Sequence, residues 1–224
     1  MRLYVLRMDW AAKRAWAEEE HDRRLTTPAG EGERDDLRRA GIAGASWAGG
    51  LAALMAGDTA AASALLVRAA EEYRTSWDAA PPGSWGRPIA MLRCRLMAGD
   101  AAGARADAES VLDAGALDAS GPIGGYCAAL ALLVLRRDPE AGPIADRIEA
   151  EGLDPAAVAH ALGALSRGLA ADFAAARRAV LASFEARDAF LEGVAVADTV
   201  LVLDALARER GVEAETLRSA LLPG

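Results

Sequence analysis

The chain has 224 residues, of which 53% are hydrophobic but only 5% aromatic, so its core must consist mainly of alanine, leucine and valine side chains. This length is enough to bury a sizeable core. The formal net charge of −8 argues against a nucleic-acid-binding protein, because such a protein needs a positive surface to neutralise phosphates. Alternating β-branched and aromatic runs are scarce and alanine favours helices, so we predict an all-α fold.

The first predicted element is a helix over residues 9–25. Asp9 stands at its start, where its carboxylate can cap the helix. Residues 26–32 contain threonine, proline and glycine, which are typical of a connection. We therefore predict two parts: residues 1–33, with this helix and its connection, and residues 34–224, with a helical repeat domain.

A glycine-rich helix is predicted next, over residues 34–56. It carries Gly49 and Gly50 close to Trp47. Each glycine in a helix costs about 1 kcal/mol relative to alanine, so this segment is helical only if another helix approaches closely at these positions. We expect Trp47 to supply contact area there.

A five-residue turn ends this helix and returns later in the chain. Leu-Met-Ala-Gly-Asp occupies residues 54–58 and again residues 96–100. In each copy the glycine is expected to end one helix in the left-handed conformation, and the aspartate to cap the next helix. Asp138 and Asp172 mark weaker copies, so the four aspartates are 42, 38 and 34 residues apart.

Each of these aspartates has an apolar residue three positions before it and a small residue four positions after it. We expect the apolar residue to close one helix against the next, and the small residue to let the two backbones approach. The apolar residues are Met55, Met97, Leu135 and Leu169, and the small residues are Ala62, Ala104, Gly142 and Ala176.

The remaining helices follow from the same signals. Gly115, Gly152 and Gly211 stand where glycines that end helices are expected. The predicted helices are 59–77, 88–98, 101–114, 122–136, 139–151, 155–170, 173–186 and 189–209, with a short capping helix from Glu213 to Leu222.

The sequence Leu-Met-Ala-Gly-Asp-Ala-Ala-Gly-Ala-Arg at residues 96–105 resembles the hairpins of tetratricopeptide-like helical repeats. At the level of architecture the resemblance covers residues 40–210, although the spacings of 42 and 38 depart from the 34-residue consensus of that family. The resemblance implies a right-handed α-solenoid of four to five antiparallel helix hairpins. It also implies a concave face that often binds peptides or partner proteins.

The best candidate binding surface is the segment from Trp77 to Pro88. Trp77 and Trp85 flank a Pro-Pro-Gly loop, and Arg87 follows. Tryptophan and arginine most often anchor interfaces, but the alternative is that both rings cover the ends of adjacent hairpins. We also expect Tyr126 among the exposed side chains of a binding groove.

Two further residues stand out in apolar surroundings. Asp198 lies beside apolar residues in the predicted helix 189–209, where a carboxylate is costly unless it is paired. The alternatives are that it receives a cationic ligand group, caps the first turn of its own helix, or pairs with Arg187. His160 has no carboxylate near it in sequence, so we expect a partly buried, hydrogen-bonded histidine rather than a catalytic base.

No metal or cofactor site is expected. Cys94 and Cys127 lie in apolar helical stretches and are interpreted as buried, reduced thiols of a cytoplasmic protein. The run Glu18 to Asp22 has the composition of a metal site, but consecutive residues splay around a helix, so we expect a solvated face. The uncharged stretches 40–57 and 119–135 are interpreted as buried helices rather than membrane spans.

The favoured function is therefore that of a non-enzymatic adaptor, which binds a protein or peptide partner on the concave face of a helical repeat array. The alternative is a bacterial immunity-type or small-molecule-binding helical module. An enzyme would require converging titratable groups, such as a deep pocket enclosing Asp198 with His160 or Arg187. Neither nucleic acid nor membrane is expected as a partner, and a homodimer is compatible with the sequence.

Overall fold

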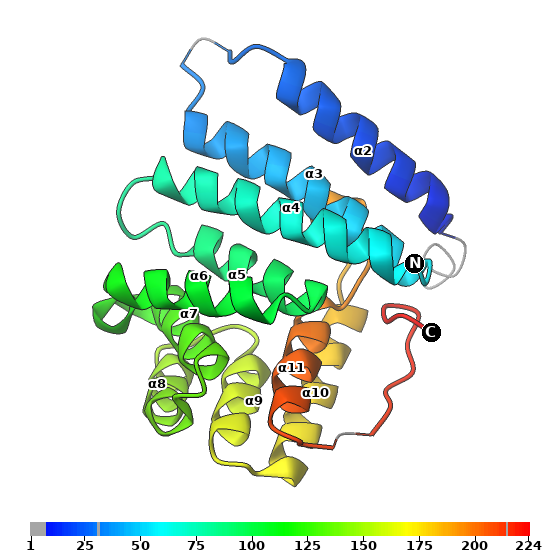
Figure 1. Cartoon of the computed structure of the whole chain (residues 1–224). Helices are drawn as coiled ribbons and strands as arrows, with labels where there is room; N and C mark the ends of the chain where they lie inside the picture. The colour runs from blue at the N-terminus through cyan, green and yellow to red at the C-terminus, as the bar shows by residue number, and fades with distance from the viewer. Residues whose placement is uncertain (1–7, 31, 214) are drawn as a thin grey trace. The chain divides into compact units, whose positions relative to one another are not determined.

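The computed structural model describes residues 8–30, 32–213 and 215–224, and in these residues every regular element is helical (Figure 1). The predicted all-α class is therefore confirmed. Two 3-10 turns, η1 (Ala116–Asp118) and η2 (Leu191–Gly193), accompany ten α-helices in this part of the chain. The α-helices are α2 (Trp10–Thr26), α3 (Asp35–Met55), α4 (Thr59–Asp78), α5 (Gly86–Ala98), α6 (Ala101–Asp113), α7 (Gly121–Val134), α8 (Asp138–Ala150), α9 (Ala156–Ser166), α10 (Ala170–Glu185) and α11 (Asp198–Glu209).

The chain divides into two compact units. The first unit combines Met1–Asp100 with Arg187–Val196 and Arg218–Gly224. The second unit combines Ala101–Ala186 with Ala197–Leu217. The predicted boundary between residues 1–33 and 34–224 stays a prediction.

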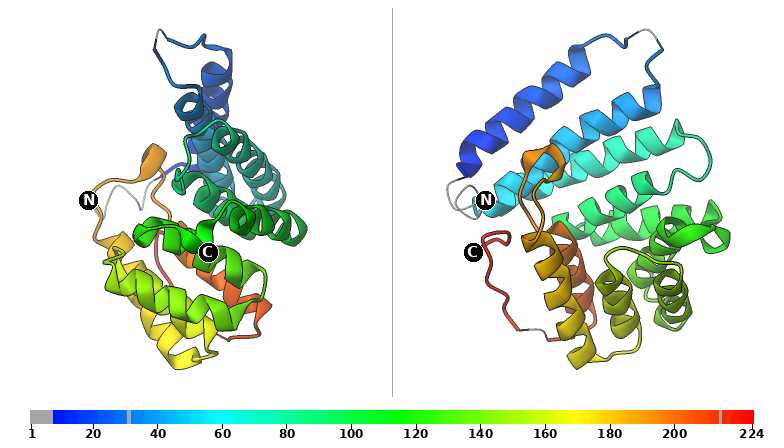
Figure 2. Two further views of the ribbon diagram at one scale, coloured as in Figure 1. Left: turned by 90° about the vertical axis from the view of Figure 1, so that its left-hand side faces the viewer. Right: turned by 180° about the vertical axis from the view of Figure 1, so that it is seen from behind.

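The helices of the first unit pack in chain order. α2 lies against α3, α3 against α4 and α4 against α5, as Figures 1 and 2 show. α3 provides the centre of this unit, because residues 42–53 are all buried. A Cβ atom on Gly50 would lie only 2.6 Å from Cγ of Leu66 in α4. The close approach predicted for the glycine-rich helix is therefore confirmed, and Trp47 is buried beside it.

The helices of the second unit also pack in chain order, from α6 to α10, and α11 lies against α9 and α10. α7 is the most buried element of this unit, since residues 124–134 are all buried. A Cβ atom on Gly125 would lie 2.2 Å from Cγ2 of Ile148, so α7 and α8 meet through this glycine. No helix in the described part of the chain is long and apolar enough to cross a membrane.

The repeated turn has the predicted conformation. Gly57 and Gly99 are left-handed, with φ of 78° and 72°. The carboxylate of Asp58 accepts a hydrogen bond from the backbone N–H of Ala61 at 3.0 Å, and Asp100 directly precedes α6. The four small residues that follow the aspartates are all buried, which is compatible with the expected approach of two backbones at them: Ala62, Ala104, Gly142 and Ala176.

The weaker copies of the turn depart from the prediction. Gly168, with φ of 68°, makes the turn between α9 and α10, so Asp172 lies in the first turn of α10 and does not cap it. Leu169 is 46% exposed and does not close the hairpin. At the earlier copy Arg136 takes the left-handed conformation, and Asp138 is the first residue of α8. At these two turns the left-handed residue, Gly168 or Arg136, follows the end of a helix, and the aspartate lies within the first turn of the next helix, where a negative charge is favourable.

Two predicted helices are wrong. The helix predicted over 189–209 begins only at Asp198, because Glu192 and Gly193 have positive φ and interrupt it. The capping helix predicted from Glu213 to Leu222 is not helical in its described residues. Instead, Arg177 donates to the backbone carbonyl of Glu215 at 2.8 Å and holds the chain in an irregular conformation.

Replacing Asp58 with alanine is expected to lower the melting temperature at pH 7 by roughly 2–4 °C, since a lost helix cap destabilises a domain of this size by that amount. The N–H of Ala61, together with Arg14, lowers the pKa of Asp58 below its usual value of 3.8. A lowered pKa in the folded state means that the stabilisation is complete above about pH 4 and is lost as pH falls further. Melting curves between acid and neutral pH measure this: the difference between wild type and Asp58→Ala should shrink in acid.

The matched variant Asp58→Asn retains a capping oxygen and should stay close to wild type at pH 7, but its melting temperature should lack the part of the acid-dependent loss that the Asp58 carboxylate contributes. Equal melting temperatures for Asp58→Ala and wild type at pH 7 would contradict the capping role.

Both cysteines are free and fully buried, as predicted. Burial raises the pKa of Cys127 to about 12, so its thiol stays protonated and unreactive at neutral pH. We expect Ellman's reagent to modify neither thiol in the native protein at mildly alkaline pH, and to modify both in guanidinium chloride. Rapid native labelling of either cysteine would contradict the packing of α5 or α7.

Candidate functional site

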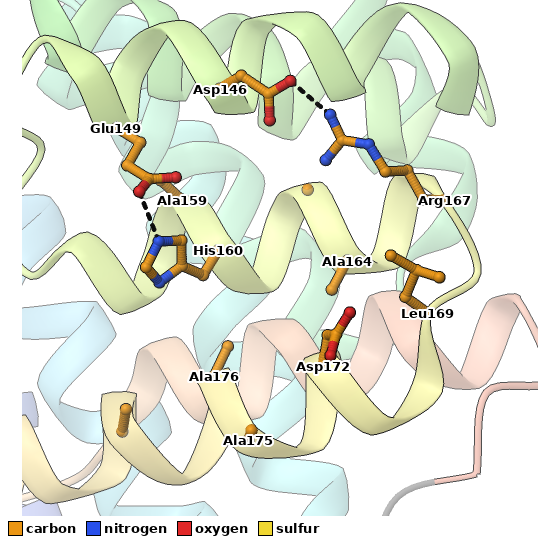
Figure 3. Close-up of a pocket in the computed structure, with 12 residues that line it drawn as sticks. Asp146, Glu149, Ala159, His160, Ala164, Arg167, Leu169, Asp172, Ala175 and Ala176 are labelled. Carbon is orange, nitrogen blue, oxygen red and sulfur yellow. Dashed lines mark hydrogen bonds and ion pairs between the residues drawn. The ribbon is translucent and has the colours of Figure 1, made fainter.

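A pocket of about 490 Å³ opens between α8, α9 and α10 in the second unit (Figure 3). Its walls carry charged side chains, and its floor consists mostly of small residues, which leave the space unfilled. The lining residues are Asp146, Glu149, Ala159, His160, Gly163, Ala164, Arg167, Leu169, Asp172, Ala175, Ala176 and Ala179.

A histidine–carboxylate contact and an ion pair connect α8 to α9 and to the residue that follows α9, at the rim of this pocket. Nε2 of His160 lies 2.7 Å from Oε1 of Glu149, and Nη2 of Arg167 lies 2.5 Å from Oδ2 of Asp146. A Cβ atom on Gly163 would lie 2.8 Å from Nη1 of Arg167, so the glycine leaves room for this side chain. The two pairs therefore fix both charged edges of the pocket.

Asp172 provides a third carboxylate from the opposite wall, on α10. No hydrogen bond or ion pair joins it to another residue of the described part of the chain, and its side chain is exposed. Three carboxylates face one guanidinium and one imidazole, so the pocket carries an excess of negative charge. Such a site suits a cationic group, because charge-assisted hydrogen bonds to carboxylates are the stronger kind.

The expected partial burial of His160 is wrong, since its side chain is 53% exposed. Its own helix carries no carboxylate, as noted from the sequence, but one from another helix lies beside it. That carboxylate belongs to Glu149 on α8, and only the packing of α8 on α9 brings the two together. Spacing along a single helix does not reveal such a neighbour.

The segment from Trp77 to Arg87 lies in the first unit, and Arg87 takes part in its internal packing. Arg87 donates to Oγ of Ser76 at 2.9 Å and forms an ion pair with Asp36, which is only 4% exposed. Trp77 and Trp85 are half-buried, and the guanidinium of Arg74 lies 5.4 Å from the ring centre of Trp77.

Tyr126 and Asp198 are both buried in the second unit. The predicted exposure of Tyr126 is therefore wrong, because α7 is covered along most of its length. Asp198 is the first residue of α11 and lies 3.5 Å from the hydroxyl of Thr199. Since Asp198 does not line the pocket described above, it does not share that pocket with His160.

The prediction that the run from Glu18 to Asp22 is a solvated face is wrong for one of its residues. His21 is buried, with Nε2 at 2.7 Å from Oε1 of Glu72 on α4 and Nδ1 at 3.0 Å from Oδ1 of Asp22. The histidine therefore links α2 to α4 through its contact with Glu72. The described residues contain no group of three or more side chains placed to hold a metal ion.

No protein-family model, curated protein or solved structure matches the chain. The resemblance to tetratricopeptide-like repeats therefore depends on the repeated turn and on the sequential packing of the helices.

Proposed function

We propose that the protein is a non-enzymatic, tetratricopeptide-like α-solenoid of helix hairpins that binds a protein or peptide partner. The observation that carries this proposal is the pocket between α8, α9 and α10, in which Asp172 has no partner of its own. A lysine or arginine side chain of the partner is the group that this pocket suits. The repeated Gly-Asp turn and the packing of successive helices support the repeat architecture.

The charge of the pocket determines the expected partner. Asp146 and Glu149 are already paired at the rim, so Asp172 is the carboxylate available to a new cation. A basic side chain entering beside α10 reaches Asp172 and the outer oxygens of the two rim carboxylates. The alanines of the floor provide contact for the methylene groups of a lysine or arginine side chain.

The test is a library of short peptides with varied charge, screened against the full chain by fluorescence anisotropy. We expect selected peptides to contain lysine or arginine, and Asp172→Asn to weaken their binding about tenfold, as the loss of one charge-assisted hydrogen bond predicts. The matched control is Asp113→Asn, which removes an exposed carboxylate at the end of α6 and should leave binding unchanged. Equal binding by wild type and Asp172→Asn, or no binding by any peptide, would refute the proposal.

A small-molecule-binding module is the second candidate, and the size of the pocket favours it. A volume of about 490 Å³ lies within the range typical of small-ligand sites. The same carboxylates would then bind a diamine or polyamine. Calorimetric titration with spermidine distinguishes the two: binding that depends on Asp172, with no peptide selected from the library, would favour the small ligand.

A further inference from the structure

The turn η2 places a glutamate against α2 and α3 within the first unit, and the orange turn lies beside α3 in the right-hand view of Figure 2. Arg24 donates two hydrogen bonds to the carboxylate of Glu192. Nη1 donates to Oε1 at 2.8 Å and Nη2 donates to Oε2 at 3.0 Å. Nζ of Lys13 donates to the backbone carbonyl of Glu192 at 2.7 Å. Both the side chain and the backbone of this one residue are therefore held by cations of α2.

The surrounding residues shape this position for a carboxylate. A Cβ atom on Gly44 would lie 3.1 Å from Oε1 of Glu192, so α3 offers the glutamate a surface without a side chain. Arg24 is itself oriented, since Nη1 donates to the carbonyl of Gly41 at 2.5 Å and Nε donates to Oε1 of Glu20 at 2.7 Å. We call Lys13, Arg24, Gly41 and Gly44 the carboxylate socket.

Glu192 occupies the socket in a conformation that its own backbone does not favour. Its φ is 51°, in the left-handed region that side chains rarely adopt. Leu191 beside it is 65% exposed, so burial of this apolar side chain does not hold the turn in place. Val194, Ala195 and Val196, directly after the turn, are buried and anchor the chain that follows it. The contacts with Arg24 and Lys13 hold Glu192 itself, and such partly exposed charged contacts are weakened by salt.

We propose that the carboxylate socket is a recognition site for an acidic side chain on a short turn, and that Glu192 is an internal ligand which a glutamate of a partner segment replaces. A bidentate arginine recognises a carboxylate by both shape and charge. The tethered Glu192 acts at a high effective concentration, so an external segment competes with it weakly until Glu192 is removed. This site is separate from the α8–α10 pocket, and the inference does not depend on the function proposed for that pocket.

The experiment uses the full chain and an end-capped peptide with the sequence of residues 188–195, Asp-Ala-Phe-Leu-Glu-Gly-Val-Ala. Glu192→Ala vacates the socket, because alanine has no carboxylate for Arg24 to bind. We expect this variant to bind the peptide at least about tenfold more tightly than wild type does. The same peptide with glutamine in place of its glutamate should not bind, and adding Arg24→Gln to Glu192→Ala should abolish binding.

Hydrogen–deuterium exchange keeps the test decisive if a variant folds poorly. In wild type, raising the salt concentration from about 0.05 to 1 M should accelerate exchange of the amides in residues 191–193 severalfold while those of α7 stay protected, because salt screens the Arg24–Glu192 pair. Exchange unaffected by salt, or peptide binding that is equal in wild type and Glu192→Ala or independent of Arg24, would overturn the proposal. The pocket variant Asp172→Asn should behave as wild type in both measurements, which separates this site from the other.

Discussion

Replacing Gly50 with alanine is expected to lower the free energy of unfolding by about 2 kcal/mol, although alanine is the better helix former. The new Cβ atom would lie 2.6 Å from Cγ and 2.9 Å from Cδ2 of Leu66, and 3.3 Å from the backbone nitrogen of Leu66. These distances are too short for a side-chain rotation alone to relieve, so α3 and α4 must move apart. Urea denaturation monitored by far-UV circular dichroism measures the loss.

The neighbouring Gly49 provides a matched control. A Cβ atom there would lie 3.5 Å from Leu65 and 3.6 Å from Ala17, which are ordinary van der Waals distances. Gly49→Ala should therefore gain part of the helix propensity of alanine and stabilise the protein by up to about 1 kcal/mol. If both variants shift stability in the same direction by the same amount, the close approach of α3 and α4 at Gly50 is not what determines the effect.

Replacing Arg210 with methionine is expected to cost about 3 kcal/mol, the typical effect of breaking a buried ion pair by removing one partner. The side chain of Arg210 is only 4% exposed, and it forms an ion pair with Asp138 at the start of α8. It also donates to the carbonyl of Leu133 at 2.6 Å, near the end of α7, and to the carbonyl of Leu206 at 2.9 Å. Methionine fills similar space but leaves the carboxylate and both carbonyls without this donor.

Arg208→Met is the control for this prediction. Arg208 lies in the last turn of α11, two residues before Arg210, but it is exposed. Its replacement should change the free energy of unfolding by no more than about 0.5 kcal/mol, as is usual for surface substitutions. Thermal unfolding of both variants tests the comparison, and a similar loss in Arg208→Met would show that charge at the end of α11, rather than the buried contacts, is responsible.

The sequence predicts this fold well wherever a local signal determines the backbone. Gly57 and Gly99 end their helices because glycine adopts positive φ without a steric penalty, and Asp58 caps because its carboxylate reaches an N-terminal amide. The predictions fail where contacts with residues far away in the sequence accompany the backbone conformation. At Glu192, contacts with Arg24 and Lys13 accompany a positive φ in a segment whose apolar pattern predicts a helix.

The candidate pocket is less predictable than the fold, for the same reason. His160 and Asp172 attract notice in the sequence, but for other roles, and their neighbours Glu149 and Arg167 become relevant only when α8, α9 and α10 pack together. Arg87 illustrates the converse case. Its position after two tryptophans is typical of an interface, yet its guanidinium binds Ser76 and the buried Asp36.

The interleaving of the two units has a consequence for biosynthesis. Arg24 leaves the ribosome 168 residues ahead of Glu192. At translation rates of about 5–20 residues per second, Glu192 is therefore synthesised roughly 10 to 30 s after Arg24. During this interval an acidic segment of another protein can reach Arg24 before the chain's own residue has been made.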